Sequence, residues 1–218
     1  YEFNNNMSTI RADSLKDRAG VGSPDCPNGL TVTGISTIAG DVGINEKIFH
    51  NGDANTAFRF PGNDQIKLET SGSSRIHLDA NGDINLGNAL ITERYVHDSG
   101  GGIQSDYTHD IITYGLFYYG VTAAANTFTF NLRGNSSTTL NSIMSTSTSF
   151  AFTLMHATTN TSRYMTAFKI DGTTQSVKWN GGSAPASAGA SGVDVYSFQI
   201  LKSAANTYTV LGNYANFA

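Results

Sequence analysis

Apolar residues alternate with polar ones over many short stretches of this chain, and that period of two is the pattern of half-buried β-strands. In residues 30–96, for example, Phe58 and Phe60 flank Arg59. These stretches are only about four to five residues long, and a lone hairpin of that size is marginal in water. We therefore expect short strands in residues 30–96 whose apolar face is covered by other copies of the chain.

The turn chemistry predicts the register of one hairpin in this region. A three-residue loop that ends at Gly82 pairs Leu78 with Ile84 and gives the glycine the left-handed conformation that this loop requires. The same register pairs Ile76 with Leu86, so all four apolar side chains lie on one face, whereas a two-residue loop would mix the faces. The residues predicted to contact other copies are Phe58, Phe60, Ile76, Leu78, Ile84 and Leu86.

Residues 110–218 predict a separate compact domain. The candidate strands are 111–121, 126–133, 148–157, 163–170, 175–179, 192–202 and 206–212. Only Leu140 to Met144 indicates a helix, and Asp171-Gly172 indicates a tight hairpin turn. Several short strands separated by turns are typical of an antiparallel β-sandwich of the jelly-roll kind.

Two other segments lack strand patterning. Residues 1–29 are predicted to be irregular, because Pro24, Pro27 and Gly29 interrupt regular structure, and Cys26 lies among them as the single cysteine. Residues 97–109, which include three consecutive glycines at 100–102, are predicted to be a linker. The expected fold is thus all-β: a segment 1–29, a stem 30–96, a linker 97–109 and a head 110–218.

The composition supports extended polar β structure and excludes several classes of protein. Hydrophobic residues make up 39% and charged residues only 14%, whereas disordered chains combine low hydrophobicity with high charge. The net charge is −4 and no cluster of Lys and Arg occurs, so the pattern of a nucleic-acid-binding protein is absent. No apolar run approaches the ~18 residues of a membrane-spanning helix, and we expect no membrane insertion.

Candidate catalytic and metal-binding chemistry is sparse. Asp79 to Asp83 copies the first positions of an EF-hand calcium loop, but the later glycine and glutamate of that loop are replaced by Ile84 and Leu90. The head has few acids (Asp110, Asp171 and Asp194) from which to build the paired carboxylates of a glycosidase. We expect no enzyme activity, no catalytic residues, no bound metal and no cofactor.

A binding role is the better candidate. The stretch from Trp179 to Gly192 is rich in Gly, Ala and Ser, which predicts a surface loop of the kind that often carries recognition. Trp179 either stacks on a sugar face or packs in the sandwich core, and Asn180 is placed to hydrogen-bond hydroxyl groups. Tyr196 and Tyr214 complete the predicted receptor-binding set, because amphipathic aromatic residues are enriched at interfaces.

Several stretches resemble the tail-fibre-like structural proteins of marine cyanophages. The stem segments GDVGI (40–44), KIFHNGDANTAFRFP (47–61) and ETSGSSRIHL (69–78) are similar to those of this family. The segment MSTIRADSL (7–15) resembles their N-termini, and WNGGSAP (179–185), DVYSF (194–198) and YTVLG (208–212) resemble their C-terminal domain. The resemblance covers most of the chain from Met7 onward.

This resemblance implies a virion protein, assembled in the host cytoplasm, that forms a homotrimer and adsorbs to the host surface. On this reading residues 1–29 attach to other virion proteins, with Ile10 and Leu15 as the expected contacts, and the head binds a host glycan or protein. A capsid-attached fibre, decoration or adaptor protein with a purely structural role is the alternative. A polysaccharide depolymerase is a third possibility.

Overall fold

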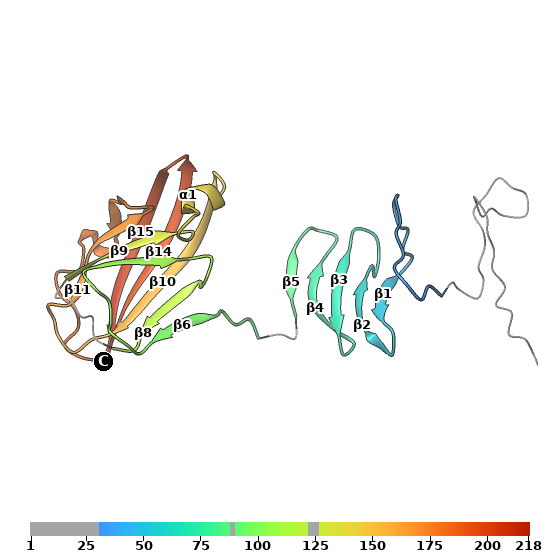
Figure 1. The fold of residues 1–218 in the computed structure, drawn as a ribbon, viewed down its shortest axis with the longest axis horizontal. Helices are drawn as coiled ribbons and strands as arrows, with labels where there is room; N and C mark the ends of the chain where they lie inside the picture. Colours follow the sequence, from blue (N-terminus) through green and yellow to red (C-terminus); the bar gives the residue numbers. More distant parts are fainter. Residues whose placement is uncertain (1–30, 88–89, 122–126) are drawn as a thin grey trace, which may run out of the picture. The chain divides into compact units, whose positions relative to one another are not determined.

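The computed structural model describes residues 31–87, 90–121 and 127–218, and the regular secondary structure within them is almost entirely β-strand (Figure 1). The chain divides into two units, Tyr1–Ala89 and Leu90–Ala218. The described helices are a four-residue α-helix, α1 (Leu140–Ile143), and a short 3-10 turn, η1 (Asn180–Gly182). No helix within these ranges is long and apolar enough to cross a membrane. The expected attachment segment, 1–29, lies outside the described residues.

The first unit contains one antiparallel sheet in which each strand pairs with the next along the chain, in the order β1-β2-β3-β4-β5 (Figure 1). Its strands are β1 (Lys47–His50), β2 (Asp53–Arg59), β3 (Ile66–Thr70), β4 (Ser73–Leu78) and β5 (Ile84–Leu86). All five strands therefore lie in a single layer, and tight turns connect them.

The predicted hairpin register is confirmed in β4 and β5. Leu78 pairs with Ile84, and Ile76 pairs with Leu86. Gly82 has the expected left-handed conformation, with φ of 88°. The Asp79 carboxylate closes the loop by accepting hydrogen bonds from the backbone N–H of Asn81, at 3.0 Å, and of Asp83, at 3.1 Å. These bonds stabilise the ionised form and lower the pKa of Asp79.

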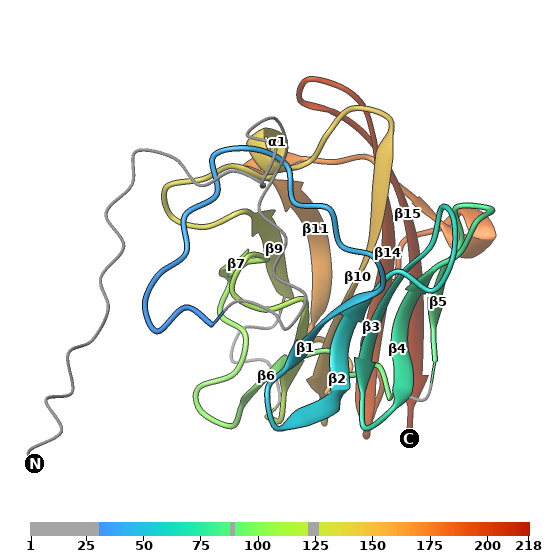
Figure 2. The same cartoon turned by 90° about the vertical axis from the view of Figure 1, so that its right-hand side faces the viewer.

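The second unit contains a six-stranded and a four-stranded sheet, with their buried residues packed into one core (Figure 2). The six-stranded sheet has the order β13-β15-β14-β10-β8-β6, and the four-stranded sheet has the order β12-β11-β9-β7. Their strands are β6 (Tyr95–Asp98), β7 (Asp106–Asp110), β8 (Leu116–Tyr119), β9 (Thr127–Arg133), β10 (Thr148–Ala157), β11 (Tyr164–Ile170), β12 (Thr173–Thr174), β13 (Val177–Trp179), β14 (Val193–Ala204) and β15 (Thr207–Phe217).

The sheets of the second unit are mixed, which corrects the prediction of an antiparallel sandwich. From β6 to β11 the chain alternates between the two sheets, so β6, β8 and β10 belong to one and β7, β9 and β11 to the other. Because a strand of the opposite sheet serves as each crossover, successive strands of one sheet run in the same direction and pair in parallel. Antiparallel pairing appears in β10, β14 and β15, and in the short hairpin of β11 and β12.

The boundary between the units also differs from the expected one. The predicted linker, 97–109, contains most of β7 and the end of β6, and both strands belong to the sandwich. Ile103, from the same stretch, is fully buried in the core. The second unit thus begins near residue 90 rather than 110, because the glycines at 100–102 form a turn between two strands instead of a spacer.

Elsewhere in this unit the alternation predicted the strands and their faces well. β9, β10 and β11 lie within one residue of the expected bounds. Apolar residues that alternate along these strands form the sandwich core, and the following are buried: Phe128, Phe130, Leu132, Phe152, Leu154, Phe168, Ile170, Tyr196, Phe198 and Ile200. The start of β11 differs from the expected alternation of Tyr164 and Thr166 with Phe168, because a register shift between Met165 and Ala167 buries Met165 instead. Asp171-Gly172 forms the predicted turn, with positive φ at both residues, and pairs Ile170 with Thr173.

Candidate functional site

The first surface of interest is one face of the five-stranded sheet in the first unit. The register aligns one apolar residue from every strand in a row: Ile48, Phe58, Leu68, Ile76 and Leu86. A second row on the same face contains Phe60, Ile66, Leu78 and Ile84, since residues two apart on a strand share a face. The structure therefore brings all six predicted contact residues together on a single face.

This apolar face is uncovered in the single chain. The exposed fraction is 56% for Ile48, 42% for Leu68 and 67% for Ile84, and Ala57 is the only buried hydrophobic residue among the described residues of this unit. Soluble monomers rarely expose contiguous apolar patches of this kind, and when they do the patch usually marks an interaction site. Contact between copies of the chain stays a prediction, since the structure contains one chain.

The opposite face of the same sheet is mostly polar, although Phe49 and Ala57 also lie on it. Between the two apolar rows, the register aligns Lys47, Arg59, Lys67 and His77 across four strands. Arg59 forms ion pairs with Glu46 and, at 3.5 Å, with Glu69. The sheet is thus amphipathic, with a solvated charged face and an apolar face that lacks a second layer.

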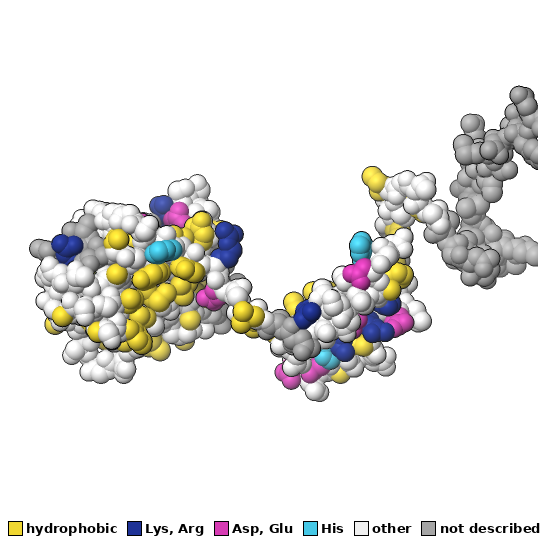
Figure 3. All heavy atoms as spheres, turned by 90° about the horizontal axis from the view of Figure 1, so that it is seen from below, with side chains coloured by type: hydrophobic (Ala, Val, Ile, Leu, Met, Phe, Trp, Pro, Cys, Tyr) yellow, Lys and Arg dark blue, Asp and Glu magenta, His cyan; other side chains and the backbone are white. Residues whose placement is uncertain are grey.

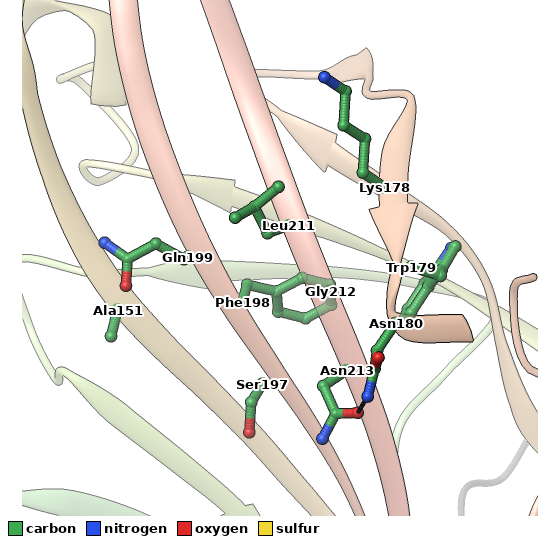
Figure 4. Close-up of a pocket in the computed structure, with 10 residues that line it drawn as sticks. All are labelled: Ala151, Lys178, Trp179, Asn180, Ser197, Phe198, Gln199, Leu211, Gly212 and Asn213. Atoms are coloured by element: carbon green, nitrogen blue, oxygen red, sulfur yellow. Dashed lines mark hydrogen bonds between the residues drawn. The ribbon is translucent and has the colours of Figure 1, made fainter. Parts of the chain in front are cut away.

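The second surface is a groove on the outer face of the six-stranded sheet, with a volume of about 600 Å³ (Figure 4). One row of its lining runs across four strands: Lys178, Leu211, Gln199 and Ala151. The next row contains Asn180, Asn213 and Ser197, two residues further along the strands. Ala151 and Ser197 are small, which leaves the hollow between longer side chains.

The polar groups of the groove lie in the two rows just described, one with Lys178 and Gln199 and the other with Asn180, Asn213 and Ser197. Asn180 donates a hydrogen bond from Nδ2 to the Oδ1 atom of Asn213 at 3.2 Å, at the end of the groove opposite Lys178 (Figure 4). Within the described part of the chain, Lys178 and Gln199 make no side-chain hydrogen bond or ion pair. These groups are therefore available to a ligand.

Trp179 lies at the edge of the groove and contacts the core. Its ring meets that of Phe198 edge-to-face, with 5.9 Å between the centroids. The indole packs over Gly212, where a Cβ atom would lie 2.9 Å from the ring and 2.6 Å from Val177. The core reading of Trp179 thus applies, because the half-buried ring packs on the core. The ring also lines the groove, and its stacking on a sugar stays a prediction.

Tyr196 and Tyr214 are corrections to the predicted binding set. They pair across β14 and β15 on the inner face of the sheet. Tyr196 is fully buried and its hydroxyl accepts a hydrogen bond from the backbone N–H of Met165 at 3.1 Å. Tyr214 donates its hydroxyl proton to the Asp194 carboxylate at 2.9 Å. The alternation of Tyr196 with Phe198 and Ile200 already carried this signal.

The acidic residues of the head are held by separate structural contacts. Asp110 pairs with Arg133 at 2.7 Å, and the Asp171 carboxylate accepts the backbone N–H groups of Leu140 and Asn141. Asp194 is fully buried and accepts hydrogen bonds from Tyr214, the Asn216 side chain and the Gly189 backbone.

His156 lies beside this buried carboxylate, with 3.8 Å between its Nε2 atom and Oδ2 of Asp194. Burial lowers the pKa of His156, since desolvation disfavours the charged imidazolium more than the carboxylate favours it. In the described ranges no three His, Cys, Asp or Glu side chains gather in a way that could hold a metal ion.

Sequence reasoning missed several groove residues. Asn213, Gln199 and Lys178 come from three different strands, and only the pairing of β13, β14 and β15 places them side by side. The sequence gives one signal for them: each is adjacent on its strand to a residue that packs in or against the core, so its side chain points outward. This pattern does not predict that the three side chains share a groove. Ile10 and Leu15, the expected attachment contacts, lie outside the described residues.

A further uncovered apolar area lies on the outer face of the same sheet, at its other edge. A shallow hollow of about 340 Å³ is lined there by Tyr95, Leu116, Tyr118, Met155 and Val193. Apolar side chains gather on the surface of the second unit (Figure 3). The outer face therefore carries polar side chains around an apolar floor beside β13, and mainly apolar side chains beside β6.

Comparison with known proteins finds no matching family, no matching curated protein and no matching solved structure.

Proposed function

We propose that this chain is the subunit of a homotrimeric virion appendage, a phage tail fibre, which adheres to the host surface through its second unit. The observation that carries the proposal is the single-layer sheet of the first unit with its uncovered apolar face. A sheet with one apolar face needs a second apolar layer, and other copies of the same sheet offer a layer of matching shape and chemistry.

The energetics favour association over a lone sheet. Burying an exposed Leu or Ile side chain contributes roughly 1.5–3 kcal/mol. Five residues of the two apolar rows are exposed in the single chain: Ile48, Leu68, Leu78, Ile84 and Leu86. Covering these five side chains would contribute up to roughly 7.5–15 kcal/mol before entropy is subtracted, which is comparable to the whole stability of a small domain, about 5–15 kcal/mol. The number three comes from the resemblance to phage fibres, since the sheet itself requires only a partner with an apolar face.

Adhesion is assigned to the second unit because it folds around its own core and presents a groove with unpaired polar groups. Several copies on one stem would bind a surface with avidity, since the second contact becomes intramolecular once the first has formed. Individually weak contacts are then sufficient, which suits an open groove.

The mass of the purified full chain in solution tests the stem. Sedimentation equilibrium is expected to give three times the chain mass, with slow hydrogen exchange in residues 47–86. A monomer in which those residues are equally protected would remove the basis of the proposal. A stable dimer would keep the covered face but contradict the trimer.

The location on the particle tests the appendage role. Gold-labelled antibody against the second unit is expected to mark the tail of intact particles, and excess purified chain is expected to reduce adsorption to host cells. Labelling distributed over the capsid, together with unchanged adsorption, would favour a decoration protein instead.

A further inference from the structure

The lining of the groove is unusual in its balance of hydrogen-bond donors and acceptors. Lys178 offers three N–H donors and no acceptor. The Asn180–Asn213 hydrogen bond uses one N–H of Asn180 and one lone pair of Asn213, so the pair still presents the N–H₂ group of Asn213 and the carbonyl oxygen of Asn180 to a ligand. No carboxylate lines the groove. The site therefore offers more donors than acceptors and carries one positive charge.

The floor of the groove is apolar and faces solvent. Leu211 has an exposed fraction of 44%, and Ala151 and the half-buried Trp179 extend the apolar area on either side. An apolar floor with a few polar groups at its ends is the usual composition of a small-ligand site. A pyranose ring matches this arrangement, since its C–H groups form an apolar face and its substituents project from the edge.

The spacing of the polar groups agrees with a ligand about the size of one sugar ring. Lys178 lies in β13 and Asn180 begins η1, two residues further along an extended backbone, which corresponds to about 6.4–6.8 Å. Gln199 and Ser197 are separated in the same way on β14, so that each end of the groove has a polar group on either side. A ring placed between the two rows can contact both.

Resting on the proposed adhesive function, we infer that the groove binds an acidic saccharide, with a uronate carboxylate or sulfate group paired to Lys178. Charge complementarity selects this class over a neutral sugar, because a site for neutral hydroxyl groups has no need of an unpaired cation. The N–H₂ groups of Asn213 and Gln199 then bind ring substituents that accept hydrogen bonds.

The chain contains a built-in reporter for this test, since Trp179 is its single tryptophan and lines the groove. The full chain is titrated with a panel of uronate and sulfated oligosaccharides, each matched to its carboxyl-reduced or desulfated counterpart. At least one acidic member is expected to shift the tryptophan emission saturably, at a concentration about tenfold below that of its neutral counterpart. Calorimetry checks the same affinities.

Substitutions assign the effect to the groove. Lys178→Gln is expected to weaken binding of the acidic oligosaccharide about tenfold and to leave the neutral one unchanged. Asn213→Asp, which adds a negative charge without changing the side-chain volume, is expected to act in the same direction. Lys169→Gln is the matched control, because Lys169 lies on the other sheet and pairs with Asp106 at 3.5 Å.

Three outcomes would overturn the inference: equal affinity for acidic and neutral partners, no binding by any member of the panel, or an unchanged affinity in Lys178→Gln. An acidic peptide that displaced the saccharide with higher affinity would also count against it. None of these outcomes alters the mass of the assembly or the labelling of particles, which test the proposed function separately.

Discussion

The two units are built from strands with the same period-two alternation, yet they use it in opposite ways. In the first unit all five strands follow one another in a single sheet, so every apolar side chain of the alternating set points to the same uncovered side. In the second unit the chain changes sheet at each step from β6 to β11, so each apolar face meets the other sheet of the same chain. Connectivity, rather than composition, decides which unit completes its own core.

The difference is visible in burial. Among the described residues of the second unit, seventeen are buried in the core, most of them large, including Phe130 and Phe168. Leu68 and Ile84 in the first unit have comparable sequence surroundings and remain exposed. A unit with its own core is expected to unfold independently of protein concentration, whereas a unit whose core lies between chains is not.

The largest effect is expected from a charge on the apolar face of the first unit. Leu68→Asp would place a carboxylate in the covered interface of the assembly, which costs several kcal/mol, and we expect the chain to become monomeric. Sedimentation velocity measures the change. Lys67→Ser, the next residue on the opposite face, is the control and should leave the mass unchanged; the reverse result would place the interface on the polar face.

The next effect concerns the core of the second unit. Phe130 is fully buried, and Phe130→Ala is expected to lower the free energy of unfolding by about 3–5 kcal/mol. Denaturant titration followed by Trp179 fluorescence measures this loss, with Ser149→Ala on the exposed face expected to stay within about 0.5 kcal/mol. A transition midpoint that moved with protein concentration would contradict the view that this unit is self-sufficient.

A smaller effect is expected where β13 closes the edge of the sandwich. Gly212→Ala would place a Cβ atom within 3 Å of both Val177 and Trp179, so we expect about 1–3 kcal/mol of destabilisation and an altered tryptophan emission. Gly115→Ala is the control, since a Cβ atom there meets nothing within 4 Å. An equal free energy of unfolding in the two variants would contradict this, because it would mean that β13 can shift away from the new Cβ atom without loss of stability.

The smallest effect is expected from acidification, which should lower the free energy of unfolding of the second unit. Burial lowers the pKa of His109 and His156 below the ordinary value of 6.5, so each binds a proton more readily in the unfolded chain. Stability of the second unit is thus full above about pH 6.5 and falls below it, by at most about 1.4 kcal/mol per pH unit for each histidine. His109→Gln should flatten this dependence in urea titrations between pH 7 and 5; an unchanged slope would mean that other groups cause it.

Local patterning accounts for the strands, their faces and two of the turns. Alternation predicted β9, β10 and β11, and it predicted the buried side chains of β9 and β10, because a side chain's face in a regular strand depends on its position along that strand. In β11 it failed for Tyr164 and Thr166, because the register shift between Met165 and Ala167 changes the face. The hairpin of β4 and β5 followed from the left-handed residue Gly82, whose position in the loop fixes which apolar residues can pair. The same reasoning, applied fully, also excludes Tyr196 from the outer surface.

The sequence by itself thus determined an all-β chain, the apolar face of the first unit and the inward residues of the second. Tertiary structure alone decided that β6 and β7 join the sandwich, that its strands pair partly in parallel, and that Lys178, Gln199 and Asn213 share a groove. The physical reason is the separation in sequence of the residues involved. The buried face of a strand depends on residues two positions apart, whereas the strand beside it in a sheet depends on contacts between segments that are far apart in the chain.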